Sequence, residues 1–221
     1  MIEIKELTKI YNSGEAQVNA LRGVTETIEN GECVAVIGKS GSGKSTLLNI
    51  IGGMDYPTSG EVYVDGENIV GYKEKQLSEY RLNKIGFIFQ FFHLIPILTV
   101  KENILLPLII AGKDPDMDYF NELAAKLGLE ERLGSFPNQL SGGQKQRVAI
   151  GRAMIHRPSV ILADEPTGNL DQATSQEILD LLLKCSSEYK QTLVIVTHDK
   201  EVAGQCGRII EIADGRILKG I

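Results

Sequence analysis

The run Cys33-Val-Ala-Val-Ile-Gly38-Lys-Ser-Gly-Ser-Gly-Lys44-Ser45 decides how this 221-residue chain is expected to fold. Its first five residues are apolar, which is typical of a strand buried on both faces. The next eight match the pattern G-x-x-x-x-G-K-[ST], and Thr46-Leu-Leu-Asn-Ile-Ile continues as a helix. A strand, a glycine-rich loop and a helix in this order form the setting in which such a loop grips phosphate groups.

This loop has a residue for each part of phosphate binding. Its glycines let the backbone curl until consecutive N–H groups point inward, and the helix that follows adds the positive end of its dipole. The Lys44 ammonium can reach the β- and γ-phosphates, and the Ser45 hydroxyl can ligate Mg²⁺. The alternative is a flexible Gly/Ser turn, which needs neither the strand nor the Lys-Ser ending. The predicted nucleotide-binding residues are therefore Gly38, Lys39, Ser40, Gly41, Ser42, Gly43, Lys44, Ser45 and Thr46.

Three more apolar runs, at 85–89, 160–164 and 193–197, resemble the one before the loop. Such runs suit a parallel sheet with helices on both faces. The mixed polar and apolar segments 2–7, 18–28 and 61–64 indicate an antiparallel flank with one wet face. Asp214-Gly215, between two strand-like runs, predicts a hairpin. The predicted fold class is α/β, a mainly parallel sheet flanked by helices with an antiparallel β flank.

The pattern becomes helical between Gln90 and about Arg157. Asp116–Leu127 and Gln144–Ile155 have helical spacing and carry no β-branched runs. We interpret residues 91–157 as a helical lobe inserted into a single domain of residues 1–221, whose core consists of 1–90 and 158–221. The boundaries are predicted to within several residues.

Composition narrows the function classes. The net charge is −6 and no Lys/Arg block occurs, which disfavours nucleic acid as a partner. Three cysteines without CxxC spacing are typical of reduced, structural thiols in a cytosolic protein. The N-terminus has no signal-peptide pattern, and charges at Lys101 and Glu102 interrupt the apolar stretch 91–110. The chain is not expected to cross a membrane by itself.

Polar residues follow two of the other apolar runs. Asp164, at the end of a predicted parallel strand, is expected to hold Mg²⁺ through its hydration shell. Glu165 suits a general base. Adjacent strand residues point to opposite faces, so Asp164 and Glu165 can serve one site only if the strand ends at this point. Pro166 indicates that it does. The alternative is a solvated acidic turn. His198 follows another strand and can bond a γ-phosphate oxygen or water, whereas His93 and His156 are read as structural.

A second glycine element, Leu140-Ser-Gly-Gly-Gln144, precedes a helix of good helix formers. Its free N–H groups and helix dipole would attract an anion, and its glycines would allow close approach. The alternative is an N-capped surface helix. A single nucleotide needs only one loop of this kind.

Together these motifs resemble the nucleotide-binding subunit of an ATP-binding-cassette (ABC) transporter, a P-loop NTPase, over essentially the whole chain. Gly38–Ser45 resembles the Walker A motif, Leu140–Gln144 the ABC signature and Val160–Glu165 the Walker B motif with its catalytic glutamate. The resemblance adds the Q-loop glutamine Gln90, which contacts Mg²⁺ and water. It also adds the D-loop Asp171, the switch histidine His198, and Tyr11 as the ring stacked on adenine. The catalytic residues it implies are Glu165, His198, Gln90 and Lys44, and the metal ligands are Ser45, Gln90 and Asp164.

The resemblance also implies partners. In the family, two subunits pack head to tail and each ATP lies between one subunit's Walker A and the other's signature. A second copy would then contribute Leu140, Ser141, Gly142, Gly143, Gln144 and Asp171 to the ATP site. ATP and Mg²⁺ are the implied cofactors. The implied location is the cytoplasmic face of the cell membrane, on an integral membrane permease, with the apolar segment 91–98 as its contact surface. The alternative for that segment is the core of the helical lobe.

Two segments of the sequence are similar to those of one group within the family, the macrolide-export and lipoprotein-release group. They are Phe89–Asn103 and Leu162–Asp171. Lys39 stands where a proline is common, and Gly151 stands where alanine is usual. Gly151 is expected to weaken its helix by about 1 kcal/mol relative to alanine. A cell-division regulator in this group leaves open mechanotransmission without transport. DNA-repair and translation ATPases fit poorly, because the chain has one cassette and no heptad insertion.

Overall fold

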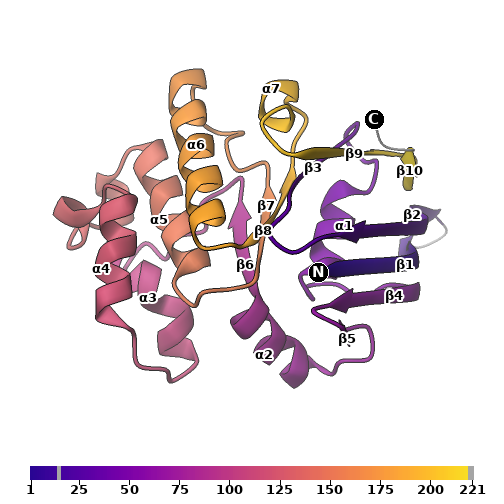
Figure 1. The fold of residues 1–221 in the computed structure, drawn as a ribbon, viewed down its shortest axis with the longest axis horizontal. Helices are drawn as coiled ribbons and strands as arrows, with labels where there is room; N and C mark the ends of the chain where they lie inside the picture. The colour runs from indigo at the N-terminus through magenta and orange to yellow at the C-terminus, as the bar shows by residue number, and fades with distance from the viewer. Residues whose placement is uncertain (14–15, 219–221) are drawn as a thin grey trace. The chain divides into compact units, whose positions relative to one another are not determined.

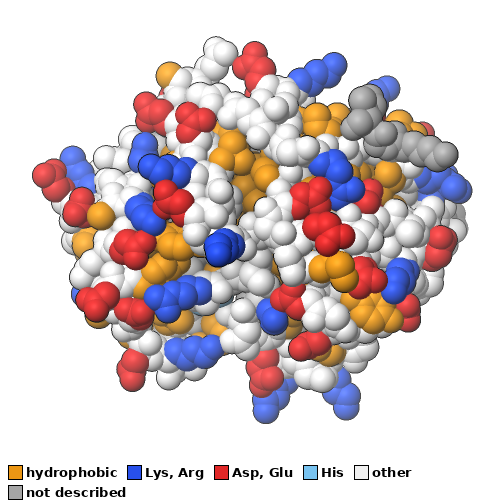
Figure 2. All heavy atoms as spheres, viewed as in Figure 1, with side chains coloured by type: hydrophobic (Ala, Val, Ile, Leu, Met, Phe, Trp, Pro, Cys, Tyr) orange, Lys and Arg blue, Asp and Glu red, His pale blue; other side chains and the backbone are white. Residues whose placement is uncertain are grey.

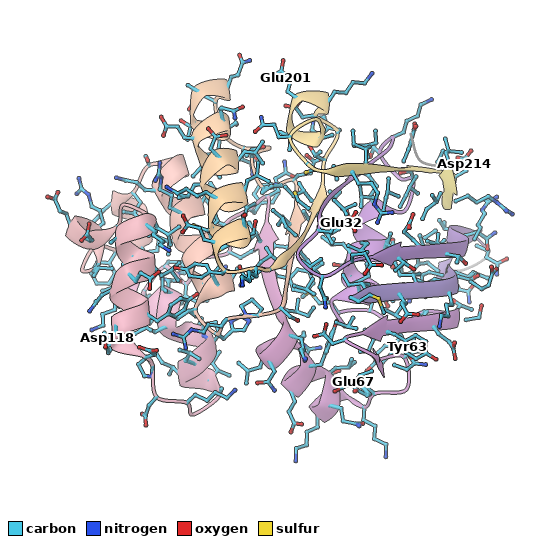
Figure 3. All side chains as sticks on the ribbon, viewed as in Figure 1. Glu32, Tyr63, Glu67, Asp118, Glu201 and Asp214 are labelled. Atoms are coloured by element: carbon cyan, nitrogen blue, oxygen red, sulfur yellow. The ribbon has the colours of Figure 1, made fainter. Side chains whose placement is uncertain are left out.

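The structure is a computed structural model that describes residues 1–13 and 16–218. The chain divides into two compact units, each described separately. Unit 1 comprises residues 1–81 and 192–221, and unit 2 comprises residues 82–191. The division at 90/91 and 157/158 that the sequence predicts stays a prediction. Figure 1 shows the course of the chain, and Figure 3 adds the side chains, with Glu201 and Asp214 near the end of the chain.

An antiparallel sheet in unit 1 is the predicted β flank. Its order is β2 (Ala16–Ile28), β1 (Ile2–Ser13), β4 (Ser59–Val64) and β5 (Glu67–Asn68). Alternate residues of β1, Ile2 and Ile4, are buried, and Ile2 lies opposite Ile28 of β2. This alternation is the reason the segment forms a strand with one face on the core.

Unit 1 also contains the strand that leads to the glycine-rich loop. β3 (Cys33–Ile37) is parallel to β8 (Thr192–Val196) and to β9 (Arg208–Ala213). β10 (Arg216–Leu218) returns antiparallel to β9 through Asp214-Gly215, as predicted. Both turn residues have positive φ, 47° and 75°, which a tight two-residue hairpin requires. The helices of this part are α1 (Lys44–Ile51) and α7 (Lys200–Ala203), with α2 (Glu74–Lys84) running into unit 2.

Unit 2 is built mostly from helices. They are α3 (Val100–Ile110), α4 (Met117–Lys126), α5 (Gly142–Met154), α6 (Gln172–Glu188) and two short 3₁₀ turns, η1 (Glu130–Arg132) and η2 (Pro137–Gln139). β6 (Ile85–Phe89) and β7 (Val160–Asp164) pair in parallel within the same unit. Helix α5 packs tightly on β6, because a methyl group on Gly86 would lie only 2.3 Å from the Ala153 carbonyl oxygen. The α/β class predicted from the sequence is confirmed.

On the face drawn in Figure 2, acidic and basic side chains are interspersed, with apolar side chains between them. Across residues 1–13 and 16–218, the helices are all too short or too polar to span a bilayer. The three cysteines are free thiols, as expected.

Candidate active site

The glycine-rich loop in unit 1 places its lysine in a shielded position. Lys44 is the first residue of α1 and only 8% exposed, and its Nζ donates to the carbonyl oxygens of Gly38 at 2.8 Å and Lys39 at 3.0 Å. Within the described part of this unit no carboxylate pairs with it. A buried ammonium that bonds only to carbonyls keeps its positive charge available to an anion.

Two glycines of the loop are required by its geometry. Gly38 has φ 153° and Gly43 has φ 108°, in the range that favours glycine. A methyl group on Gly38 would lie 2.1 Å from the Ile212 carbonyl oxygen, and one on Gly43 would lie 2.4 Å from that of Ala20. The loop is therefore seated directly on β9 and β2. The N-terminus of α1 has no side-chain cap, which leaves its first N–H groups for a ligand.

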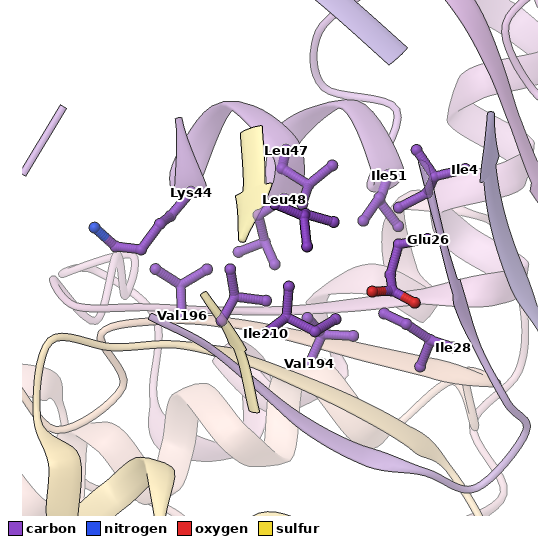
Figure 4. A pocket seen from close by; sticks show the side chains of 12 residues that line it. Ile4, Glu26, Ile28, Lys44, Leu47, Leu48, Ile51, Val194, Val196 and Ile210 are labelled. Carbon is purple, nitrogen blue, oxygen red and sulfur yellow. The ribbon is translucent and has the colours of Figure 1, made fainter. Parts of the chain in front are cut away.

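A small cavity lies beneath α1, within unit 1. Its volume is about 10 Å³, room for roughly one water molecule. Figure 4 shows Lys44 and Glu26 at opposite ends of an otherwise aliphatic lining. Glu26 is paired with Arg208 at 3.2 Å. The cavity is far too small for a nucleotide, so it is packing space behind the loop rather than the ATP site.

Tyr11 of β1 lies beside the start of α1. Its hydroxyl donates to Asp55 at 2.5 Å and interacts with Thr46 of the loop. The Lys9 ammonium lies 4.7 Å from the centre of the Tyr11 ring. Burial and the bond to Asp55 raise the pKa of Tyr11, so the phenol stays neutral at pH 7. The ring is 39% exposed, which leaves aromatic surface for a base.

His198 follows β8 in unit 1. The turn is fixed by Thr197, whose backbone N–H donates to Val36 of β3 at 3.1 Å and whose hydroxyl accepts from Asp199. Asp199 in turn caps α7. His198 is exposed, as expected for a side chain that meets a ligand.

In unit 2 the strand β7 ends at Asp164. This ending is the condition under which Asp164 and Glu165 can both serve one site. Glu165 has φ 48°, an uncommon value for a residue with a Cβ, so the backbone reverses immediately after the strand. The turn closes through Gly168, whose N–H donates to the Glu165 carbonyl at 3.1 Å.

Gln90 lies against this turn. It follows Phe89, which is the register partner of Asp164. The Asn169 amide donates to the Gln90 carbonyl at 2.9 Å, and a methyl group on Gly168 would lie 2.9 Å from Gln90 Nε2. Unit 2 thus brings together the predicted metal ligands Gln90 and Asp164 and the predicted base Glu165.

The signature turn is a helix N-terminus with a capping box. Ser141 Oγ accepts from the Gln144 N–H at 3.3 Å, and Gln144 Oε1 accepts from the Ser141 N–H at 2.9 Å. Methyl groups on Gly142 and Gly143 would lie 3.1 Å from Leu170 and 2.6 Å from Thr174. The N-capped helix weighed as an alternative is therefore present. Capping uses one lone pair of the exposed Ser141 hydroxyl and leaves its proton to donate.

Asp171 caps the next helix. Its carboxylate accepts from the Thr174 N–H at 3.0 Å and from the Thr174 hydroxyl at 2.7 Å. These bonds lower the pKa of Asp171 and keep it ionised. The contact of Thr174 with Gly143 places the D-loop aspartate and the signature turn side by side within unit 2.

Three residues that hold the backbone around the proposed site were not identified from the sequence: Gln146, Arg152 and Asn103. Gln146 is fully buried, and its amide donates to the Pro166 carbonyl at 2.6 Å, which ties α5 to the turn after β7. Arg152 and Asn103 hold the segment after Gln90. For Gln146 the available signal was a polar residue on the buried face of an amphipathic helix. Asn103 gave no such signal, because α3 shows no helical period.

The residues fit a nucleoside triphosphate with Mg²⁺. In unit 1 the shielded Lys44 ammonium, the uncapped start of α1 and the buried Ser42 hydroxyl, which has no partner among the described residues, form an anion cradle. In unit 2 the oxygen ligands suited to Mg²⁺ stand at the end of β7. These features define an α/β nucleotide-binding protein of the phosphate-loop class.

Comparison with known proteins agrees with this class. The family model described as ABC transporter matches residues 21–168. The chain is 45% identical to the lipoprotein-releasing system ATP-binding protein LolD of Geobacter metallireducens, over 99% of the chain and 98% of that protein. It is 47% identical to the macrolide export ATP-binding/permease protein MacB of Mannheimia succiniciproducens, over 99% of the chain but 34% of that protein.

Solved structures give the same result. The dimeric structure of MJ0796, a bacterial ABC transporter cassette, matches with a TM-score of 0.91 and 46% identity, over 100% of the chain and 98% of that chain. A post-hydrolysis state of the same cassette, bound to ADP and Pi, matches with a TM-score of 0.90 and 45% identity, with the same coverage. The chain belongs to the ABC transporter family. It is an ATPase that binds ATP with Mg²⁺.

Proposed function

We propose that this chain is the ATP-hydrolysing subunit of a membrane transporter and that it works as a head-to-tail pair on the cytoplasmic face of the membrane, bound to a permease. One observation carries the proposal. The chain has two separate glycine turns at helix N-termini, before α1 in unit 1 and before α5 in unit 2, and one nucleotide needs only one such turn.

The phosphate side of the mechanism rests on unit 1. Lys44 neutralises the β- and γ-phosphates, and the backbone N–H groups of residues 38–46 donate to their oxygens. Tyr11 offers its ring to the adenine. When bound, ATP with Mg²⁺ supplies the phosphoryl group that is attacked. Ser45, Gln90 and Asp164 would hold the metal ion.

The hydrolytic step needs a positioned water. Glu165 orients the water and accepts its proton, and His198 donates a hydrogen bond to the γ-phosphate oxygen or to that water. The reversed backbone at Glu165, φ 48°, supports this role because the strand alternation, which would point adjacent residues to opposite faces, no longer applies after Asp164. Ser141 and the N–H groups of the signature turn from the second copy stabilise the developing charge. Most of the rate enhancement then comes from positioning and electrostatics.

The pairing is supported by the dimeric state named for the MJ0796 cassette. Two copies related by a two-fold axis present the same surface to each other, so both glycine turns of each copy are used. Asp171 and the residues Leu140–Gln144 belong to this surface in the proposal, and they are contiguous within unit 2. ATP favours closure because it can bridge two copies only in the closed state.

The permease contact is assigned to the apolar loop, defined as residues Phe91–Leu98. Five of its eight residues are exposed: Phe91, His93, Ile95, Pro96 and Ile97. Ile97 is 82% exposed and Phe91 64%, which favours a docking surface over the core of the lobe. The relative named as an ATP-binding/permease protein carries a matching region within one long chain, which supports a permease as the partner.

We infer the substrate class from the relatives that match the chain over their full length. Full-length similarity to lipoprotein-releasing ATP-binding proteins favours release of a lipid-anchored substrate from the membrane over export of a soluble macrolide. The match to the macrolide exporter covers only 34% of that protein, so it bears on the ATPase alone.

Purification from native membranes tests the proposal. The tagged chain should hydrolyse ATP and should bring an integral membrane protein with it. Ile97→Asp should lose that protein while retaining ATP hydrolysis, because it charges the apolar loop only. Ile110→Asp is the matched control, since Ile110 is 78% exposed on α3 outside the loop. Equal loss in both variants, or co-purification unaffected by Ile97→Asp, would contradict the permease contact.

A further inference from the structure

The apolar loop is held by its backbone, while Phe91 and Ile97 face outward. At its start, the Asn169 amide donates to the Gln90 carbonyl at 2.9 Å. At its end, the fully buried Asn103 of α3 donates to the Leu98 carbonyl at 3.0 Å and accepts from the Ile95 N–H at 2.8 Å. A surface whose backbone is fixed before binding loses little entropy when a partner docks.

The middle of the loop is held by one arginine of α5. Arg152 Nη1 donates to the His93 carbonyl at 2.6 Å, and Nη2 donates to the Phe92 carbonyl at 2.8 Å. His93 has φ 48°, so the clamp holds the loop at its most strained residue. We call this pair of bonds the Arg152 clamp.

Burying the Arg152 guanidinium costs desolvation free energy that packing alone would not require. Among the described residues, Arg152 makes no ion pair, and its guanidinium bonds only to the two carbonyls. Burial lowers the pKa of Arg152, although the group stays charged at any physiological pH. An apolar side chain could fill the same space without the desolvation penalty. The two directed bonds are therefore the feature that needs an explanation.

The same helix begins with the signature turn. Arg152 lies eleven residues after Ser141, roughly 16 Å along the axis of α5, and the helix is continuous between them. The loop also lies beside the turn, because a methyl group on Gly142 would lie 4.0 Å from the Phe92 ring. A displacement of the apolar loop would thus move helix α5 both at Arg152 and at the signature turn where the helix begins.

We propose that Arg152 is a positioning residue that couples the apolar loop to the signature turn through the clamp and α5. This inference rests on the proposed function, in which the loop meets the permease and the signature meets the ATP of the second copy. The coupling is reciprocal. A partner on the loop would bias the signature, and ATP engagement of the signature would shift the loop.

The chain contains no tryptophan, which makes a clean reporter available. Ile97→Trp places a single tryptophan at a loop position that is 82% exposed. In a Glu165→Gln background, which slows turnover, ATP should produce the dimer on a sizing column and change the emission of this introduced tryptophan. Absence of the dimer would contradict the proposed function. A dimer without any change in emission would contradict the coupling alone.

Arg152→Met then tests the clamp, because methionine keeps much of the volume and loses both bonds. The dimer should still form with ATP, and the emission change should fall at least about fivefold. Arg147→Met is the matched control. Arg147 is on the same helix and donates to the Leu127 carbonyl at 3.2 Å, away from the loop, so the emission change should remain.

A more conservative variant keeps the proposal testable should Arg152→Met not fold. Arg152→Lys keeps the charge but cannot donate to two carbonyls in the planar arrangement of a guanidinium, so it should restore part of the emission change. Circular dichroism reports whether each variant is folded. If folded Arg152→Met shows an unchanged emission response, the proposal is overturned. If Arg152→Met does not fold, an unchanged emission response in Arg152→Lys would overturn it. A loss of equal size in Arg147→Met would overturn it as well.

Discussion

The side-chain amide of Gln146 donates to the carbonyl oxygen of Pro166 at 2.6 Å. This bond joins α5, which begins with the signature, to the turn that carries Glu165. Gln146 is fully buried, so the bond is shielded from water. In the proposed head-to-tail pair, the signature would serve the partner's ATP and Glu165 its own. The Gln146 bond would then link the two ATP sites through one unit of each copy.

Glu165→Gln should retain ATP binding, trap the ATP-bound dimer and lower hydrolysis by at least about 10²-fold, because glutamine cannot accept the proton of the attacking water. Steady-state phosphate release and a sizing column measure the two effects. Glu131→Gln, an exposed glutamate of η1, is the control and should hydrolyse ATP at the wild-type rate. Wild-type turnover in Glu165→Gln would contradict the role of Glu165 as the base.

Ser141→Arg should leave ATP binding by a single copy intact and abolish cooperative turnover, because Ser141 is assigned to the partner's nucleotide. The change also removes a helix cap, which costs about 1 kcal/mol. Asp116→Ala removes the cap of α4 in the same unit and controls for that loss. If Ser141→Arg prevents a single copy from binding ATP, the assignment across the interface is wrong.

His156 should make the protein less stable in mild acid. Its Nε2 is 2.9 Å from the Ile85 carbonyl, and its Nδ1 is buried without a partner among the described residues. Burial lowers its pKa below the ordinary 6.5, so between the two values the unfolded chain binds the proton and the folded chain does not. The free energy of unfolding should therefore fall as the pH drops below 6.5. Urea titrations at pH 7.5 and 5.5 should show a smaller fall in His156→Gln, and an equal fall would contradict this assignment.

Gly151→Ala should not stabilise the protein, despite the helix propensity of alanine. Propensity alone favours alanine by about 1 kcal/mol. The added methyl group, however, would lie 2.9 Å from Leu127 Cδ1 and 3.2 Å from Ile104. Overpacking of this kind costs about 1–3 kcal/mol, so a net loss of about 1 kcal/mol is expected in urea unfolding. Gly71→Ala, where a methyl group meets nothing within 4 Å, should be neutral or slightly stabilising. A gain in Gly151→Ala would contradict the packing argument.

The strands and motifs could be predicted because their signals are local. Continuous apolar runs mark β3, β6, β7 and β8, and the glycine-rich loop follows its strand directly. Helix α3 escaped prediction as a distinct element. After Lys101, Glu102 and Asn103 it is apolar all round and contains Pro107, so it shows no helical period. Its start is fixed by the capping box of Thr99 and Glu102. The N–H groups of Val100 and Lys101 also donate to the carbonyl oxygens of Ser135 and Leu133.

The supporting residues of the site could not be predicted from spacing. Arg152 is separated by 60 residues from the Phe92 carbonyl that it binds, and Gln146 by 20 from that of Pro166. Which carbonyl a side chain meets depends on the packing of α5 on β6. A sequence shows only that a polar residue stands on a helix. The roles assigned to the motif residues themselves stay predictions until the variants above are measured.

In the proposed pair, one ATP site needs two copies of this chain. This requirement is tested by mixing two variants that are each inactive. Lys44→Ala spoils the phosphate loop and keeps the signature, whereas Ser141→Arg does the reverse. A mixed head-to-tail dimer contains one intact site, so ATP hydrolysis should reappear on mixing, at up to about a quarter of the wild-type rate. A mixture as inactive as its two components would contradict the claim, because a site complete within each copy cannot be restored by a partner.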